Sequence, residues 1–70
     1  MASGCMRKGM WLELIGSDGN IAKATIERQN PLVIAIVLLE GTPVSRDFKC
    51  NRVIIWVNTL GKVTRVPVVG

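Results

Sequence analysis

Two strongly apolar, β-branched runs separated by a charged segment constrain the fold of this chain most. The first run, VIAIVLL, covers residues 33–39, and the second, VIIWV, covers residues 53–57. Runs of this length and composition are typical of buried strands. The segment between them, GTPVSRDFKCNR at residues 41–52, is too long and too charged for a tight hairpin turn. The sequence therefore predicts two strands joined by a long loop.

The pattern within each run predicts how the strands lie. The first strand is expected over residues 33–39, and its unbroken apolar character predicts a central strand buried on both faces. The second is expected over residues 52–58. A turn at residues 58–62, which contains Gly61, precedes a third short strand at residues 63–66. By its period of two, the second strand places two sets of side chains on opposite faces: Val53, Ile55 and Val57 on one, and Arg52, Ile54 and Trp56 on the other.

A helix is predicted before the strands, over residues 20–29. Asp18 and Asn20 are both candidates for its N-cap, and Asn30-Pro31 ends it because proline disfavours a helical residue before it. One helix and a small sheet predict a single α+β domain over residues 1–70, with an N-terminal arm at residues 1–10. By their spacing, Ala22, Thr25, Ile26 and Gln29 share one face of the helix, with Ile21 at its margin. The apolar patch before the helix, Trp11, Leu12, Leu14 and Ile15, should dock on the core.

The length of the chain limits what it can be. A domain of 70 residues buries only about 60% of its unfolded surface, so some additional tether is expected. The longest apolar run, Leu32 to Leu39, has eight residues, whereas a membrane-spanning helix needs roughly 20. The N-terminus lacks the apolar core of a signal peptide. Either the chain is made without a leader or a leader has been removed, and the sequence leaves the compartment unknown.

The positive charge is scattered. The net charge is +4, and the nine basic residues form no run and are accompanied by only three aromatic residues. Nucleic-acid modules need a clustered basic face, often with stacking aromatics. A solubilising surface is therefore the preferred interpretation. A small basic module that binds nucleic acid or an anionic membrane surface is the alternative function, and steep salt dependence of binding would identify it.

Catalysis has little support in this sequence. The absence of histidine removes the commonest general base, the serine–histidine triad and most zinc sites. Glu13, Glu27 and Glu40 form no paired arrangement, and Ser45 has no base near it in the sequence. The chain is therefore predicted to be no enzyme and to need no cofactor or metal.

The two cysteines, Cys5 and Cys50, lie far apart and form no CxxC motif. They are either two buried free thiols or a disulfide that pins the N-terminal arm near the charged loop. Spacing alone leaves both alternatives open. A bond that closes a segment of this length is worth roughly 4 kcal/mol in the chain-entropy model.

The middle of the loop carries Arg46, which by composition is one exposed arginine. The residues before Arg46 restrict the backbone: Pro43 fixes its φ at about −65° and Val44 favours an extended conformation. Ser45 and Asp47 flank the arginine with acceptors. The loop is therefore predicted to present Arg46 on an extended backbone.

Arg52 begins the strand that follows the loop, and is suitably placed to hold these acceptors. Hydrogen bonds between arginine and carboxylate are charge-assisted and geometrically specific. Arg52 is therefore a candidate support for the loop.

Several stretches together carry a resemblance to a known family. They are Trp11-x-Glu13-Leu14-x-Gly16, the helix IAKATIERQNP, the strand and loop AIVLLEGTPVSRDF, Cys50-Asn51-Arg52-Val53, and the ending VPVVG. The chain resembles the potato inhibitor I family of serine protease inhibitors, in particular its disulfide-containing plant branch. The resemblance covers nearly all of residues 5–70.

The resemblance implies a helix packed on a small mixed parallel and antiparallel sheet, with a long binding loop between two parallel strands. It implies that residues 41–49 are the reactive-site loop, that Arg46 is the primary specificity residue and that Arg46–Asp47 is the scissile-type bond. The remaining residues of the binding loop are Gly41, Thr42, Pro43, Val44, Ser45, Phe48 and Lys49.

Support of the loop is also implied by the resemblance. Cys5 and Cys50 match the paired cysteines of the disulfide-containing branch, which implies a disulfide. Arg52 matches the first of two arginines that brace the loop, but Ile54 stands where the second is usual. Ser45 stands where threonine is common. Both departures concern the rigidity of the loop and not the fold.

The function implied is inhibition of a trypsin-like serine protease by a monomer whose loop enters the cleft like a substrate. Arg46 would fill a specificity pocket that carries a buried aspartate. The expected partner is the protease, with no nucleic acid and no membrane. The resemblance implies roles in plant defence and wound response. A disulfide would suggest extracellular or vacuolar exposure, with a leaderless cytosolic form as the alternative.

Overall fold

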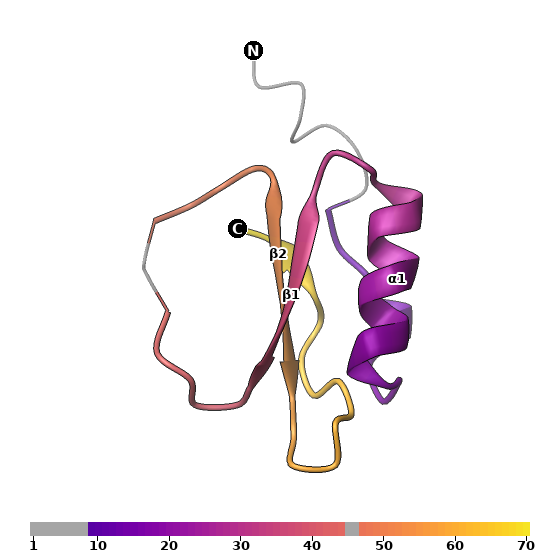
Figure 1. Cartoon of the computed structure of the whole chain (residues 1–70), viewed down its shortest axis with the longest axis vertical. Helices are drawn as coiled ribbons and strands as arrows, with labels where there is room; N and C mark the ends of the chain where they lie inside the picture. The colour runs from indigo at the N-terminus through magenta and orange to yellow at the C-terminus, as the bar shows by residue number, and fades with distance from the viewer. Residues whose placement is uncertain (1–8, 45–46) are drawn as a thin grey trace.

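A computed structural model describes residues 9–44 and 47–70 of the chain. In order, its elements are the 3-10 helix η2 (Leu12–Leu14), the helix α1 (Gly19–Gln29) and the strands β1 (Ile34–Leu39), β2 (Arg52–Val57) and β3 (Val68–Val69) (Figure 1). The sheet has the order β1-β2-β3, in which β2 is parallel to β1 and antiparallel to β3. The predicted α+β fold with a mixed sheet is confirmed.

A local sequence signal sets the start of α1. Oδ1 of Asp18 accepts hydrogen bonds from the backbone N–H groups of Asn20 at 2.8 Å and Ile21 at 3.2 Å, so Asp18, not Asn20, is the N-cap. The helix begins at Gly19, one residue earlier than predicted. A Cβ atom on Gly19 would lie 2.8 Å from Cγ1 of Val57, so this glycine lets the first turn approach the sheet closely.

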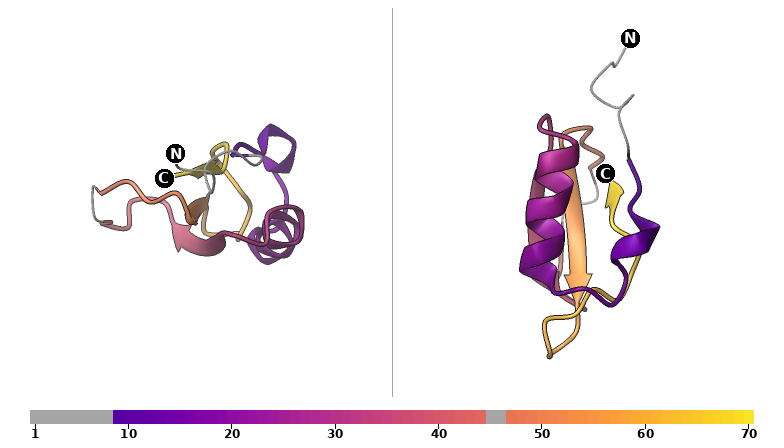
Figure 2. Two further views of the ribbon diagram at one scale, coloured as in Figure 1. Left: turned by 90° about the horizontal axis from the view of Figure 1, so that it is seen from above. Right: turned by 90° about the vertical axis from the view of Figure 1, so that its right-hand side faces the viewer.

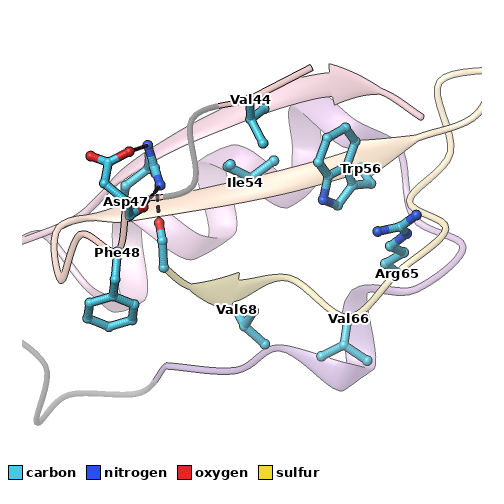
Figure 3. A pocket seen from close by; sticks show the side chains of 10 residues that line it. Val44, Asp47, Phe48, Ile54, Trp56, Arg65, Val66 and Val68 are labelled. Carbon is cyan, nitrogen blue, oxygen red and sulfur yellow. Dashed lines mark hydrogen bonds and ion pairs between the residues drawn. The ribbon is translucent and has the colours of Figure 1, made fainter. Parts of the chain in front are cut away.

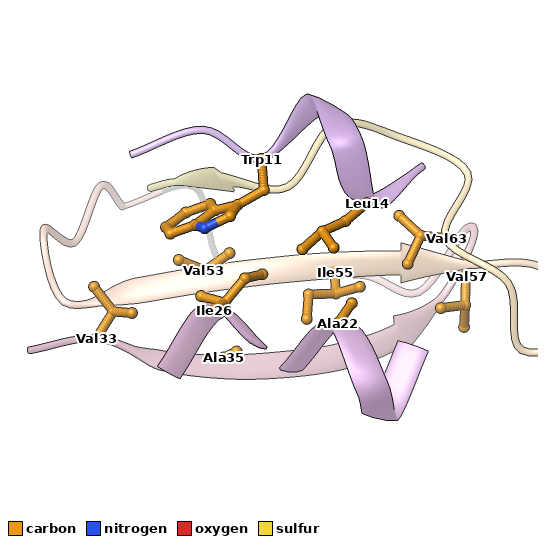
Figure 4. Packing of buried hydrophobic residues seen from close by; sticks show 10 residues of the cluster. All are labelled: Trp11, Leu14, Ala22, Ile26, Val33, Ala35, Val53, Ile55, Val57 and Val63. Atoms are coloured by element: carbon orange, nitrogen blue, oxygen red, sulfur yellow. The ribbon is translucent and has the colours of Figure 1, made fainter. Parts of the chain in front are cut away.

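The core lies between α1 and η2 on one side and one face of the sheet on the other (Figures 2 and 4). Trp11 has no exposed surface, and its Nε1 donates to Oε1 of Gln29 at 3.0 Å. Leu12 and Ile15 were expected to dock on the core, but they are 64% and 46% exposed because they lie on the outer side of η2 and the turn after it. The buried apolar cluster consists of Trp11, Leu14, Ala22, Ile26, Val33, Ala35, Val53, Ile55, Val57 and Val63.

The prediction for the first strand is wrong in two respects. β1 is an edge strand, not a central strand buried on both faces, and it begins at Ile34 instead of Val33. Ala35 faces α1 and is buried, whereas Ile34 and Ile36 are 61% and 39% exposed. The reason is that α1 covers only one face of the sheet, so the other face of β1 stays open (Figure 2).

The alternation predicted for β2 is confirmed, although the strand ends at Val57, one residue early. Val53, Ile55 and Val57 are buried. The third strand is not at residues 63–66, where only Val63 forms a bridge, with Val57. β3 lies further along, because the chain there turns toward the N-terminal segment, and the carbonyl of Pro67 accepts from the N–H of Trp11 at 3.0 Å.

The predicted N-terminal arm lies mostly outside the described residues. Its last two residues pair with β3: the N–H of Val69 donates to the carbonyl of Gly9 at 3.0 Å, and Met10 forms a bridge with Val68. Residues 9 and 10 are therefore part of the folded domain.

Two side chains of α1 cap the outer edge of β1. The N–H of Ala35 donates to Oε2 of Glu27 at 2.9 Å, and Nζ of Lys23 donates to the carbonyl of Ala35 at 2.8 Å. The two side chains also pair with each other at 2.7 Å. The hydrogen bond from Lys23, followed by that from the Ala35 amide, lowers the pKa of Glu27 below its ordinary value of 4.5.

We predict that the contribution of Glu27 to stability depends on pH. Because the pKa of Glu27 is lowered in the folded state, this contribution is fully present above about pH 4.5 and is lost as the pH falls through the folded-state pKa. Urea unfolding of the parent and of Glu27→Gln should show the parent more stable at pH 7, with a difference that shrinks below pH 4.5. A difference that stayed constant down to about pH 2 would contradict the cap.

Candidate functional site

The site is the connection between the two parallel strands. In the register of the sheet Ile34 lies opposite Arg52, so β2 starts level with the beginning of β1. The chain must therefore return along the whole strand, and the described parts of this connection, residues 40–44 and 47–51, lie on the side of the sheet opposite α1 (Figures 1 and 2). The predicted loop at residues 41–49 falls in this connection. Ser45 and Arg46 lie outside the described residues.

The leading end of the loop is fixed to both strands. The N–H of Glu40 donates to the carbonyl of Val57 at 2.8 Å. Gly41 has φ +89°, which favours glycine. The N–H and Oγ1 of Thr42 then both donate to the carbonyl of Leu39, at 3.1 and 2.7 Å. The chain therefore turns sharply as it leaves β1, and Pro43 and Val44 continue it as exposed residues without regular structure.

The trailing end is held by Arg52, whose side chain is only 14% exposed. Nη2 donates to the backbone carbonyl of Asp47 at 2.6 Å, and Nη1 lies 3.9 Å from Oδ1 of the same residue. Nε donates to the carbonyl of Gly70 at 2.7 Å. The structure thus brings together Arg52 and Asp47, as expected, although the shorter contact is to the backbone and not to the carboxylate. Gly70 was not anticipated, because no motif marks it.

The rest of the trailing segment is more exposed. Nζ of Lys49 lies 3.2 Å from Oδ2 of Asp47. Phe48 is 67% exposed, and its ring lies beside Gly70. Cys50 is half-buried in the turn before β2, whereas Cys5 lies outside the described residues. The disulfide therefore stays a prediction at this point.

A second group of charged residues meets the start of the loop. Nη2 of Arg65 lies 3.1 Å from Oε1 of Glu40, and Oγ1 of Thr64 donates to Oε2. The guanidinium carbon of Arg65 lies 5.4 Å from the centre of the Trp56 ring. Alternation placed Trp56 on this face of the sheet, but nothing in the sequence pattern placed Arg65 beside Glu40.

A cavity of about 390 Å³ separates the loop from the open face of the sheet (Figure 3). Ile54 forms part of its wall on the same face as Arg52 and Trp56, the position where the resemblance implies a second bracing arginine. Most of the lining side chains are apolar, and charged groups lie at the two ends of the cavity, with Asp47 at one and Arg65 at the other. The complete lining consists of Val44, Asp47, Phe48, Arg52, Ile54, Trp56, Arg65, Val66, Val68 and Gly70.

The described residues offer no candidate metal centre and no membrane-spanning helix. Within residues 9–44 and 47–70, no group of three or more His, Cys, Asp or Glu residues is placed to hold a metal ion. In the same ranges no helix is both long enough and apolar enough to cross a membrane. What the geometry provides is a long connection whose described ends are tied to the sheet, at residues 40–42 and at Asp47.

The sequence and the fold are similar to those of known proteins. A profile of the Potato inhibitor I family matches residues 2–70. An inhibitor of trypsin and hageman factor from Cucurbita maxima is 56% identical over 97% of this chain and 100% of its own length. A Glu S.griseus protease inhibitor from Momordica charantia is 48% identical over the same shares. The crystal structure of bitter gourd trypsin inhibitor superimposes with a TM-score of 0.93 at 45% identity, over 94% of this chain and 97% of that one.

These relatives are protease inhibitors, which confirms the prediction that the chain is not an enzyme. The match extends over almost the whole sequence and over the fold around the loop. The chain therefore belongs to the potato inhibitor I family.

Proposed function

We propose that this chain inhibits trypsin-like serine proteases by binding in the cleft like a substrate. Arg46 enters the specificity pocket, and Arg46–Asp47 is the scissile-type bond. The observation that carries the proposal is the contact of Arg52 with the carbonyl of Asp47 at 2.6 Å, immediately after that bond. A tether at this point restrains the backbone that a protease would have to distort.

The pairing of β1 with β2 would keep the two fragments of a cut chain together. The leading half is continuous with β1, and the two hydrogen bonds of Thr42 to Leu39 hold its direction as it leaves the strand. The trailing half would begin at Asp47, the residue that Arg52 holds. Its new amine therefore stays close to the acyl group and can re-form the bond. A preorganised loop also loses less entropy on binding, which favours tight association.

The target protease follows from the loop and not from the fold. The relatives compared above are named for different proteases: one is an inhibitor of trypsin and hageman factor, and the other is a Glu S.griseus protease inhibitor. Arg46 is a long cation, and the pocket of trypsin carries a buried aspartate that pairs with it. This complementarity supports a trypsin-like enzyme as the partner. Roles in plant defence and wound response stay predictions.

A basic module for nucleic acid or an anionic membrane surface receives less support. Among residues 9–44 and 47–70, four cationic side chains contact carboxylates: Lys23, Lys49, Arg52 and Arg65. Their charge is therefore partly neutralised, and we do not propose this alternative.

We expect Arg46→Ala to lose most trypsin inhibition, by several kcal/mol of binding free energy, because one charged anchor dominates such interfaces. Titration of trypsin activity with the inhibitor measures the loss. Arg28→Ala, which removes an exposed arginine on α1 across the sheet from the loop, should inhibit like the parent. Arg46→Leu should shift preference towards chymotrypsin or elastase. Full trypsin inhibition by Arg46→Ala would refute the assignment.

We also propose a Cys5–Cys50 disulfide beside the trailing end of the loop. Cys50 directly precedes Asn51, whose carbonyl accepts from Ile34, so a bond there would restrain the entry into β2. No free cysteine occurs among the described residues, which supports the pairing.

The expected stabilisation by this bond is about 2–4 kcal/mol. Mass spectrometry of the oxidised protein under non-reducing conditions should show no free thiol, and reduction should speed hydrolysis of Arg46–Asp47. Two free thiols in the oxidised, purified protein would rule the bond out.

We expect Arg52→Ala to raise the rate at which trypsin hydrolyses Arg46–Asp47. It removes two hydrogen bonds from a charged donor, each worth about 1.5–3 kcal/mol, so an increase of roughly tenfold or more is anticipated. Ile54→Arg should slow hydrolysis, because a guanidinium there extends into the cavity beneath the loop. Equal rates in the parent and both variants would show that packing and the disulfide alone hold the loop.

A further inference from the structure

We propose that Arg65 is a second positioning residue for the binding loop, acting through Glu40 at the loop's first turn. The inference rests on the proposed function, because it concerns the same loop. It assigns a role to a residue outside the loop and outside the strand that follows it. In effect, Arg65 supports the leading end of the loop, while Arg52 supports the trailing end.

The carboxylate of Glu40 is bound at both oxygens. Nη2 of Arg65 lies 3.1 Å from Oε1, and Oγ1 of the neighbouring Thr64 donates to Oε2. The backbone N–H of Glu40 is held separately by the carbonyl of Val57 at 2.8 Å. Glu40 is thus fixed at its main chain and at its side chain, by two different segments.

The residues that hold Glu40 are themselves held by β2. The guanidinium of Arg65 lies over the Trp56 ring, 5.4 Å from its centre, within the range of cation–π attraction. The N–H of Thr64 donates to the carbonyl of Trp56 at 2.9 Å. Trp56 therefore fixes residues 64–65 through its ring and its backbone, and connects Glu40 to the middle strand of the sheet.

The position of Glu40 gives this cluster leverage on the loop. The next residue, Gly41, has φ +89°, and a glycine allows many backbone directions once its neighbours are released. Fixing Glu40 therefore restrains one side of this flexible position, while the hydrogen bonds of Thr42 to Leu39 restrain the other. Figure 3 shows Arg65 and Asp47 at opposite ends of the cavity, with Ile54 between them. Arg52 on β2 and Arg65 in the segment before β3 thus support the two ends of the loop. The resemblance implies that a pair of arginines on β2 is the usual support.

The effect should be smaller than that of Arg52 and more sensitive to salt. The side chain of Arg65 is 62% exposed and that of Glu40 32% exposed, whereas that of Arg52 is 14% exposed. Exposed ion pairs contribute little and are screened by salt.

The test combines variants at both residues. Trypsin hydrolysis of Arg46–Asp47 and amide hydrogen exchange at Thr42 are measured for the parent, Arg65→Ala, Glu40→Gln, the double variant, and Arg65→Lys. We expect Arg65→Ala to raise both rates about two- to tenfold, and to have no further effect when Glu40 is already Gln. Arg65→Lys should restore part of the slow exchange, because the ammonium retains the charge. Arg28→Ala is the matched arginine control and should change neither rate.

The outcomes separate the two proposals. If the parent fails to inhibit trypsin, the proposed function is wrong, but coupled exchange at Thr42 still supports the role of Arg65. If Arg65→Ala leaves Thr42 exchange unchanged, or changes it equally with and without Glu40, the inference is overturned whatever the inhibition assay shows. The effect of Arg65→Ala should also shrink between about 0.05 and 0.5 M salt, while that of Arg52→Ala persists.

Discussion

The parallel pairing of β1 with β2 is the constraint on which the rest of this structure depends. Parallel neighbours cannot be joined by a tight turn, and residues 40–44 and 47–51 of the connection form no helix. A strand of this length spans about 20 Å, and residues 40–51 reach at most about 40 Å when fully extended. Half of that reach is needed to return along the strand. The parallel pairing therefore requires a long connection, and its described residues Pro43, Val44, Phe48 and Lys49 are exposed.

Such a segment needs support from beneath, and β2 supplies it without giving up its place in the core. Val53 and Ile55 face α1 and are buried, while Arg52 and Trp56 on the alternate positions face the loop. One strand thus stabilises the domain with one face and the site with the other. A one-residue slip in register would exchange the two faces and destroy both. Both the packing of the core and the support of the loop therefore depend on β2.

The features that could be predicted from the sequence are the local ones. The cap at Asp18 and the alternation along β2 depend on neighbouring residues, and the resemblance placed Arg52 beside the loop. The edge position of β1 could not be predicted, because an apolar strand has the same sequence pattern whether one or both of its faces are covered. The contacts of Arg52 with Gly70 and of Arg65 with Glu40 join residues far apart in the chain. Helix and strand periodicity predict contacts only between residues that are close in the sequence, so these pairs could not be predicted.

The cap that Lys23 and Glu27 place on Ala35 has a consequence for how the protein behaves among its own copies. An uncovered edge strand is a template to which another chain can add a strand, and β1 is apolar on its open face as well. By occupying the N–H and the carbonyl of Ala35, the helix removes two of the groups that such an added strand would need. The same two side chains that fasten α1 to the sheet thus leave fewer backbone groups on β1 with which another copy could pair.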